Sequence, residues 1–351
     1  MRDRFQKKLS AFAGLILLQT RCDNPTENPR GALAVTNITF TDNAPEQQSF
    51  ADAVAAGLRR SDKCVSSKFL YDEEGSRCFE AVCELPEYYV TRTELDILRN
   101  NIDEIAALIG PRARIIEFGS GATMKIRLLL DALVEPAVHV PVDISRDHLQ
   151  DAAAELAIDY PSLLVTALAT DFTSPFDLPP AHREIAANVG FFPGSTIGNF
   201  TPEEATSFLR MARDLLEGGS LLIGVDLKKD TATLEAAYND CTKVSSHFNL
   251  NLLRRMRRDL DAELNLDGFC HYATYEPDPG RMAIGIQSLH DQTIIIGDNR
   301  YWLGKGERLH TQHAYKFTVV EFQDLVRSVG FTPIRAFVDK DNLFSVHFLS
   351  A

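Results

Sequence analysis

The segment from Arg114 to Lys125, RIIEFGSGATMK, constrains the fold more than any other part of this chain. A short apolar run ends in an acid, two glycines follow, and a helix-forming segment begins at once. Gly119 and Gly121 lack a Cβ atom where the backbone must turn tightly and approach a ligand closely. The first N–H groups of the helix would then face a polar ligand. This order of strand, glycine loop and helix predicts a nucleotide-binding α/β domain.

The glycine spacing helps to identify the ligand. A dinucleotide-binding loop has a third glycine three positions after the second, and Met124 occupies that position here. The pattern Glu-x-Gly-x-Gly instead resembles the first motif of S-adenosylmethionine-dependent methyltransferases, whose loop approaches the methionine half of the cofactor. We therefore expect S-adenosylmethionine as the cofactor, and an NAD-linked oxidoreductase stays as an alternative.

Strand and helix patterns alternate after the glycine loop. Further strands are expected at 139–143, 163–168, 185–192 and 220–227. Such alternation predicts a parallel, doubly wound, Rossmann-like sheet. Polar or glycine residues stand at the ends of four consecutive expected strands: Gly119, Asp143, Asp171 and Asn199. Because ligands of these sheets bind at the carboxyl ends of the strands, the four positions predict one binding edge.

Two helix starts carry capping signals. Thr201, followed by Pro202 and by Glu204, is typical of a capping box with proline at the first helical position. Thr91 and Glu94 have the same spacing, and an apolar stripe follows them, so we expect a second capping box there.

The pattern along the chain predicts an α/β protein with a second, smaller α+β substrate domain. Helices at 47–110 and an insertion at 228–318 would form the substrate domain, and 111–227 the cofactor domain, to which 319–351 returns. Within the insertion, 228–278 is expected to be helical, with β segments at 282–289, 292–297 and 310–317. A helix at 319–329 and a strand at 344–349 would complete the chain.

Residues 1–46 are expected to be a disordered extension or linker. Basic residues precede an apolar patch from Leu9 to Leu18, which resembles a signal peptide, but no cleavage box follows. The patch is also too short to span a bilayer, so no membrane partner is expected. We favour a poorly ordered extension or an upstream start codon, and then an Asn- and Pro-rich linker from 23 to 46.

Charge and cysteine usage restrict the partners. The formal net charge of −13 argues against a nucleic-acid partner, because no basic field would hold a polyanion. The six cysteines show no spacing that suits zinc, so no metal is expected. They are typical of free thiols in a reducing compartment, which predicts a cytoplasmic protein. We further expect a monomer.

Several motifs in the same order resemble one enzyme family, the ergothioneine-pathway histidine Nα-methyltransferases and their relatives. The motifs are Tyr-Asp-x-x-Gly-Ser at 71–76, Leu-Pro-Glu-Tyr-Tyr-x-Thr-Arg-Thr-Glu at 85–94, Glu-x-Gly-Ser-Gly at 117–121, Gly-Ser-Thr-Ile-Gly-Asn at 194–199 and Ser-His-Phe-Asn-Leu-Asn at 246–251. The resemblance covers roughly residues 47 to 350, and the motifs at 85–94 and 194–199 are the most specific.

The resemblance implies a cofactor site. Gly119 and Lys125 would contact the methionine portion of S-adenosylmethionine. Asp143 would take both ribose hydroxyls, a task that suits a carboxylate with two acceptor oxygens. Asp171 and the backbone of Phe172 would read the adenine.

The resemblance also implies a small-molecule amino-acid substrate. Asn199 and Tyr238 would hold its α-carboxylate and orient its amine, and Tyr71 and Tyr88 would close the pocket. Among these, Asn199, Tyr238 and Tyr71 are the expected catalytic residues. Methyl transfer to a neutral amine needs alignment more than acid or base catalysis, so no Ser-His-Asp or metal constellation is required.

Three positions depart from the family pattern at the side-chain end of the substrate. Gln312 and Ala314 stand where the histidine enzymes have a glutamate and a serine that hold the imidazole, and Ile284 stands where methionine is frequent. L-histidine is the first expectation, with trimethylhistidine as a possible product, and a less polar amino acid is the alternative. A non-catalytic protein that binds S-adenosylmethionine is a further alternative, which the amino-acid clamp disfavours.

Overall fold

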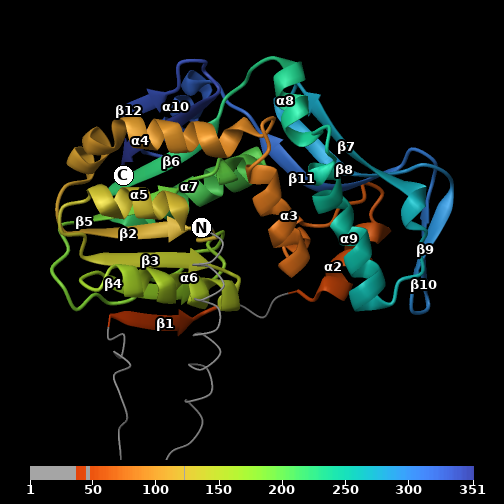
Figure 1. The fold of residues 1–351 in the computed structure, drawn as a ribbon, viewed down its shortest axis with the longest axis horizontal. Helices are drawn as coiled ribbons and strands as arrows, with labels where there is room; N and C mark the ends of the chain where they lie inside the picture. Colours follow the sequence, from red (N-terminus) through yellow and green to blue (C-terminus); the bar gives the residue numbers. More distant parts are fainter. Residues whose placement is uncertain (1–36, 45–47, 122) are drawn as a thin grey trace, which may run out of the picture. The chain divides into compact units, whose positions relative to one another are not determined.

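An eight-stranded sheet organises the fold of the computed structural model (Figure 1). The structure describes residues 37–44, 48–121 and 123–351. Expectations for residues 1–36, including the apolar patch, lie outside the described residues. Residues 37–351 form one compact unit by their contacts.

The strand order is β1-β4-β3-β2-β5-β6-β13-β12. The strands are β1 (Ile38–Asp42), β2 (Ala113–Phe118), β3 (Val138–Asp143), β4 (Leu164–Ala169), β5 (Ala187–Phe192), β6 (Ser220–Asp226), β12 (Thr332–Val338) and β13 (Phe344–Ser350). Neighbours from β1 to β6 pair in parallel, whereas β13 pairs antiparallel with both β6 and β12. The expected parallel α/β sheet is therefore confirmed, with an antiparallel β13 added at one side.

Helices cover both faces of the sheet. Successive residues of a strand point to opposite sides, so an apolar strand offers side chains to the helices on each face. Ile115 packs in one apolar cluster with α4 (Tyr89–Ile109), α5 (Met124–Ala132) and α6 (Arg146–Asp159). Its neighbour Ile116 packs in another cluster with α7 (Pro202–Leu216) and α10 (Val319–Ser328). Both residues are fully buried, so the strand before the glycine loop is anchored on both faces.

A smaller antiparallel sheet, β11-β8-β7, lies beside the main sheet's strand ends (Figure 1). Its strands are β7 (Phe269–Glu276), β8 (Arg281–Ser288) and β11 (Arg308–Tyr315), and a hairpin joins β9 (Gln292–Ile296) to β10 (Asn299–Leu303). The helices on this side are α2 (Phe50–Arg59), α3 (Glu73–Cys83), α8 (Thr231–Tyr238) and α9 (Val244–Leu260). Three short 3-10 helices complete the described chain: η2 (Ser67–Leu70), η3 (Thr196–Asn199) and η4 (Leu266–Gly268).

The small sheet approaches the main sheet closely at one point. A Cβ atom on Gly198, in η3, would lie 2.7 Å from the carbonyl oxygen of Tyr315, in β11. Only glycine permits this approach, which brings the segment that carries Asn199 against the strand that carries Gln312.

The insertion contains more strand than its sequence pattern indicates. The expectation of helix through residue 278 is wrong for Phe269–Glu276, which forms β7 and pairs with β8 along its whole length. β10 and β12 were not anticipated. Tyr272 and Ala273 are neighbours on β7 and both are buried, so this strand is covered on two faces. Over a short run, the apolar pattern of such a strand cannot be distinguished from that of a buried helix.

The expectation of a linker through residue 46 is wrong for Ile38–Asp42. These residues form β1, which pairs in parallel with β4 at the sheet edge. The strand is short, and its apolar residues Ile38 and Phe40 are only partly buried. Its flanks are rich in Asn and Pro, which hid the alternation in the sequence.

Of the two expected capping boxes, one is confirmed. Thr201 accepts a hydrogen bond from the backbone N–H of Glu204, whose carboxylate accepts from the N–H of Thr201. The box at Thr91 is wrong, because α4 begins at Tyr89 and Thr91 lies within its first turn. Glu94 is 1% exposed and its carboxylate turns into the protein interior.

Candidate active site

The carboxyl ends of β4, β3, β2 and β5 meet at one edge of the main sheet. The structure therefore brings Gly119, Asp143, Asp171 and Asn199 to this edge. The loops are joined by backbone hydrogen bonds: Gly119 donates to the carbonyl of Val142 at 2.9 Å, and Thr170 donates to the carbonyl of Asp143 at 3.0 Å.

The glycine loop has the backbone that its sequence predicts. Gly119 has a φ of +77°, in the region that favours glycine. Two residues before Gly119, Glu117 is buried, and its carboxylate accepts from the hydroxyl of Ser120 at 2.8 Å. The same oxygen lies 3.2 Å from Nε2 of His139 on β3. These contacts fix the loop between two strands and leave its outer side open for a ligand.

Asp143 ends β3 and holds its own loop in shape. One carboxylate oxygen accepts from the backbone N–H of Ser145 at 2.8 Å. Burial raises the pKa of this carboxyl above its ordinary value, although the hydrogen bond from Ser145 opposes the shift. A partly buried acceptor of this kind is suited to a ligand that offers hydroxyl donors.

Asp171 and Phe172 follow β4. Asp171 accepts from the backbone N–H and the hydroxyl of Thr173, at 2.9 and 2.6 Å, which closes a tight turn. The Phe172 ring packs edge-to-face with Phe192, with ring centroids 5.9 Å apart. The partly buried Phe172 ring thus packs against the core cluster and lies beside Gly119, so the turn stands next to the glycine loop.

Lys125 does not point freely toward the glycine loop. Its ammonium donates to the buried carboxylate of Glu94 at 2.5 Å, and that carboxylate also accepts from the N–H of Gly194. A Cβ atom on Gly224 of β6 would lie 2.0 Å from the Glu94 carboxylate, so the glycine makes room for it. Glu94 thus joins α4, α5 and the loop after β5.

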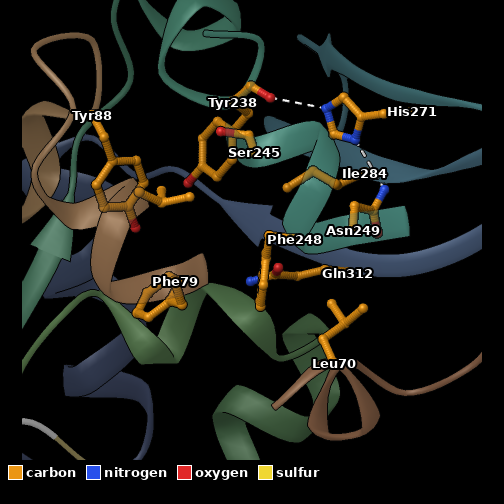
Figure 2. Close-up of a pocket in the computed structure, with 11 residues that line it drawn as sticks. Leu70, Phe79, Tyr88, Tyr238, Ser245, Phe248, Asn249, His271, Ile284 and Gln312 are labelled. Atoms are coloured by element: carbon orange, nitrogen blue, oxygen red, sulfur yellow. Dashed lines mark hydrogen bonds between the residues drawn. The ribbon is translucent and has the colours of Figure 1, made fainter. Parts of the chain in front are cut away.

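A pocket lies where α3, α9 and the small sheet meet (Figure 2). It is lined by Leu70, Phe79, Val82, Tyr88, Tyr238, Ser245, Phe248, Asn249, His271, Ile284 and Gln312. Four of these residues were expected from the sequence to bind the substrate: Tyr88, Tyr238, Ile284 and Gln312. The others were not expected as site residues. Phe248 and Asn249 lie in the motif at 246–251, which could have revealed them, whereas the rest stand singly on separate elements and give no spacing signal.

Aromatic rings form one side of the pocket (Figure 2). The rings of Tyr88 and Tyr238 meet edge-to-face with centroids 5.9 Å apart, and Phe79 packs on Phe248 at 5.6 Å. Tyr71 stacks against the same two phenylalanines, although 40% of it is exposed. Burial raises the pKa of the Tyr71, Tyr88 and Tyr238 hydroxyls, so all three stay protonated at neutral pH.

Gln312 bridges the pocket and the main sheet. Its side-chain amide donates to Oδ1 of Asn199 at 2.9 Å. Ile284 is the residue opposite Gln312 on β8 and also lines the pocket. Ala314 lies one step further along the same face, where it packs with Ile284 and Met282 in a small apolar cluster instead of on the pocket wall.

The wall opposite the aromatic rings is polar and uncharged (Figure 2). Nε2 of His271 lies 2.9 Å from the carbonyl oxygen of Tyr238, and Nδ1 lies 3.0 Å from the amide nitrogen of Asn249. Nε2 therefore carries the proton and Nδ1 accepts. Asn249 in turn accepts from the hydroxyl of Thr311 at 2.7 Å. Burial lowers the pKa of His271, which keeps this neutral tautomer.

A buried charge cluster lies behind Tyr238 and consists of Tyr89, Asp226, Lys229 and Lys316. Asp226 contacts the ammonium of Lys316 at 2.5 Å and that of Lys229 at 2.7 Å. It also accepts from the hydroxyl of Tyr89 at 2.9 Å. Asp226 ends β6 as Asp143 ends β3. This position of an acid at a strand end was the signal in the sequence that could have revealed Asp226 as a candidate site residue.

Neither a metal site nor a membrane span emerges from residues 37–44, 48–121 and 123–351. Within these ranges, no group of three or more His, Cys, Asp and Glu residues is arranged to hold a metal ion. No helix there combines the length and apolar character that crossing a bilayer requires.

The chain is similar in sequence to several known proteins. A family model described as histidine-specific methyltransferase, SAM-dependent, matches residues 50–351. The histidine N-alpha-methyltransferase of Mycolicibacterium smegmatis is 35% identical over 81% of this chain and 89% of its own. The protein of that name from Mycobacterium tuberculosis is 32% identical over 84% of this chain and 92% of its own. Ergothioneine biosynthesis protein 1 of Neurospora crassa is 28% identical over 80% of this chain and 32% of its own.

Proposed function

Because the chain belongs to the family of histidine-specific, S-adenosylmethionine-dependent methyltransferases, we propose that it methylates the α-amine of free L-histidine. The chain is an enzyme, and S-adenosylmethionine is its cofactor. Up to three methyl groups on the same nitrogen are compatible with this chemistry, since each product except the last retains a lone pair. The observation that carries the proposal is the pocket in which Tyr88, Tyr238 and Gln312 meet beside Asn199.

The cofactor would lie along the edge formed by the glycine loop and the ends of β3 and β4. The left-handed backbone of Gly119 and the partly buried carboxylate of Asp143 fit such a ligand. Asp143 would bind the ribose hydroxyls, and the turn at Asp171 and Phe172 would meet the adenine. Lys125, whose ammonium is fixed by Glu94, would place positive charge near the methionine carboxylate. The cofactor supplies an electrophilic methyl carbon bonded to a sulfonium.

The amino acid would enter the pocket with its α-carboxylate toward Asn199 and Tyr238. Tyr71 and Tyr88 would enclose the α-amine. Because burial keeps these phenols protonated, they act as hydrogen-bond donors or acceptors and not as phenolate bases. Gln312 and Ile284 lie toward the substrate side chain in this orientation, and Ala314 packs against Ile284.

The reaction needs alignment more than proton transfer. The amine lone pair attacks the methyl carbon as the carbon–sulfur bond breaks, and the thioether leaves uncharged. After a first or second transfer the methylated ammonium releases a proton before it can react again, whereas a trimethylated nitrogen has no proton to release and keeps its charge. Holding the two reactants in line contributes about 7–11 kcal/mol in favourable cases. An enclosed, largely apolar pocket also favours the uncharged amine, which is the form that reacts.

A second candidate is the same reaction on a less polar amino acid. The pocket is lined by Leu70, Phe79, Val82, Phe248 and Ile284, which offer an imidazole no hydrogen bond. Gln312 can give or accept one bond but is already paired with Asn199. An aromatic or aliphatic side chain would pack against these apolar residues without needing a hydrogen bond from them.

The proposal is tested by incubating the protein with S-adenosylmethionine and each of the twenty amino acids, with mass spectrometry as the readout. We expect methylated L-histidine, and Asn199→Ala should lower kcat/KM for it by at least about tenfold, because a bond to a charged carboxylate is lost. Methylation of another amino acid would support the second candidate. Cofactor binding with no methyl transfer to any amino acid would indicate a non-catalytic protein.

We also propose that the enzyme is a cytoplasmic monomer. The described cysteines, Cys64, Cys78, Cys83, Cys241 and Cys270, are free thiols, which supports a reducing compartment. A molar mass near 39.1 kDa in light scattering would support the monomer, and twice that mass would refute it.

A further inference from the structure

The charge cluster behind Tyr238 has no role in the reaction as described so far, yet it is deeply buried. The side chains of Asp226, Lys229 and Lys316 are 0%, 8% and 2% exposed. Burying unpaired charge is costly, and here two ammonium groups face one carboxylate. Within the cluster, the two lysines share one carboxylate; Asp339 also acts on Lys229, whereas Asp226 is the carboxylate that contacts Lys316. A buried cation near a substrate pocket is suited to an anionic group of the substrate.

Lys316 connects this charge to the pocket. Its ammonium contacts Asp226 at 2.5 Å and donates to the hydroxyl oxygen of Tyr238 at 2.9 Å. An ammonium can only donate, so the Tyr238 oxygen is the acceptor in this bond. The hydroxyl proton of Tyr238 is then directed to another acceptor. Lys229 contacts Asp226 and Tyr89 and makes no such link to Tyr238.

Burial by itself would disfavour a charged lysine at this place. The neighbouring carboxylate of Asp226 more than compensates and holds the pKa of Lys316 above its ordinary value. Burial likewise opposes the charge on Asp226, but Lys316 and Lys229 hold the pKa of its carboxyl below the ordinary value. Lys316 therefore stays a cation, and a permanent donor to Tyr238, throughout the neutral pH range.

The cluster also reaches the other substrate-binding elements. The backbone N–H of Asp226 donates to the hydroxyl of Ser195 at 2.9 Å, in the loop that leads to Asn199. Asp226 further accepts from Tyr89, the neighbour of Tyr88. One buried acid thus fixes the segments that carry three of the residues expected to bind the amino acid.

We propose that Lys316 is a positioning residue for the substrate's α-carboxylate: it orients the Tyr238 hydroxyl as a donor to that carboxylate and supplies a buried positive charge behind it. This inference rests on the proposed function. It adds Lys316 to the residues that recognise the substrate, although Lys316 would act on the substrate only through Tyr238. It makes the enzyme selective for free amino acids, because an uncharged carboxyl derivative gains nothing from the buried cation.

The test compares the affinity of the wild type for L-histidine and for L-histidinamide, by calorimetry with S-adenosylhomocysteine present. Lys316→Met should reduce the preference for the carboxylate roughly tenfold or more, the scale of a bond to a charged group. Lys316→Arg should restore part of it. Lys228→Met is the matched control, since Lys228 pairs with Glu321 at the surface, and its preference should equal that of the wild type.

Tyr238→Phe supplies the second arm. If Lys316 acts through the hydroxyl, Tyr238→Phe should lower the same preference, and the double variant should lose less than the sum of the single losses. Equal weakening of both ligands by Lys316→Met, or additive losses in the double variant, would overturn the proposal. Lys229 still compensates Asp226 in Lys316→Met, so this variant is expected to fold.

Two outcomes keep this inference separate from the proposed function. Should Lys316→Met fail to fold, Tyr238→Phe leaves every charge in place, and an unchanged carboxylate preference in it would overturn the inference alone. If the wild type methylates a different amino acid, the comparison uses that amino acid and its amide. If no amino acid binds at all, both the proposed function and the inference on Lys316 fail.

Discussion

At the scale of single residues, Asp143 offers the most direct test of the cofactor edge. Asp143→Ala should weaken the binding of S-adenosylhomocysteine, because it removes the acceptor proposed for the ribose hydroxyls. Bonds to a charged acceptor are worth about 1.5–3 kcal/mol each, so the loss of affinity should reach at least tenfold in calorimetry. Asp147→Ala, in the first turn of α6, is the control. Unchanged affinity in Asp143→Ala would refute the ribose assignment.

Gln312 governs the expected side-chain selectivity. Gln312→Glu places a carboxylate beside Asn199, whose amide can turn to donate to it, and offers an acceptor to an imidazole N–H. We expect the kcat/KM ratio of L-histidine to L-phenylalanine to rise by roughly tenfold or more. The same exchange at Gln323, on α10, should leave the ratio unchanged. No rise at Gln312 would place the selectivity elsewhere, with Tyr88 as the next candidate.

The sequence revealed residues that follow a repeated pattern and missed those that depend on packing. Gly119, Asp143 and Asp171 each follow a strand, so topology alone gathers them. His271 lies on β7 and Lys316 directly follows β11, and both meet Tyr238 only after the insertion folds back. No local spacing marks such residues, because the contacts span tens of positions in the chain.

At the scale of elements, β1 is the clearest addition to the expected fold. Asn37, directly before β1, donates to the carbonyls of Tyr160 and Leu163 at 3.1 and 2.8 Å, and β1 pairs with β4 along five residues. A chain that begins at Thr41 should therefore be less stable by a few kcal/mol, on the order of several lost hydrogen bonds. A chain that begins at Thr36 keeps the strand and is the matched control. Equal melting temperatures of the two chains would show that β1 contributes nothing.

Helix and strand periods explain which elements could be predicted. The capping box expected at the start of α7 is confirmed, and α10 begins with a box of the same spacing, Thr318 and Glu321, which was not singled out in the sequence. At α4 the same spacing was misleading, because Glu94 binds Lys125 in the interior. A polar residue that serves a tertiary contact is indistinguishable from a cap until its partner is known.

At the scale of the whole molecule, buried histidines predict a stability that falls on acidification. Burial lowers the pKa of His313 and of His347 to about 4, from an ordinary 6.5. Each stays neutral when folded but takes a proton when unfolded, so the stabilisation is present above pH 6.5 and is lost as pH falls toward 4. Each such group contributes a slope of up to about 1.4 kcal/mol per pH unit.

Chemical denaturation over this pH range checks that prediction. His347 is fully buried on β13, where Ser345 is its neighbour at 2.9 Å. His347→Gln keeps a polar partner for Ser345 but cannot titrate, so its free energy of unfolding should fall less steeply with acid than that of the wild type. Parallel curves for the two proteins would show that His347 does not titrate on unfolding.

The overall architecture was predictable because it follows from alternation, whereas the pocket was predictable only in part. The expected division into a cofactor domain at 111–227 and an insertion at 228–318 stays a prediction. One apolar core cluster runs from the main sheet into α9 and β9, so the core does not mark a boundary between the two. The residues that line the pocket all come from 47–110 and 228–318, the two segments expected to form the substrate domain. The close approach at Gly198 brings Asn199 of the main sheet to Gln312 at the edge of this pocket.

The central claim is that the α-nitrogen of a free amino acid is the methyl acceptor. The most direct measurement transfers an isotope-labelled methyl group from S-adenosylmethionine to L-histidine and locates it by heteronuclear NMR. The account predicts that the labelled carbon correlates with the α-hydrogen of the product, and that no label reaches the imidazole ring. Label on a ring nitrogen, or no labelled histidine from a protein that binds the cofactor, would contradict it.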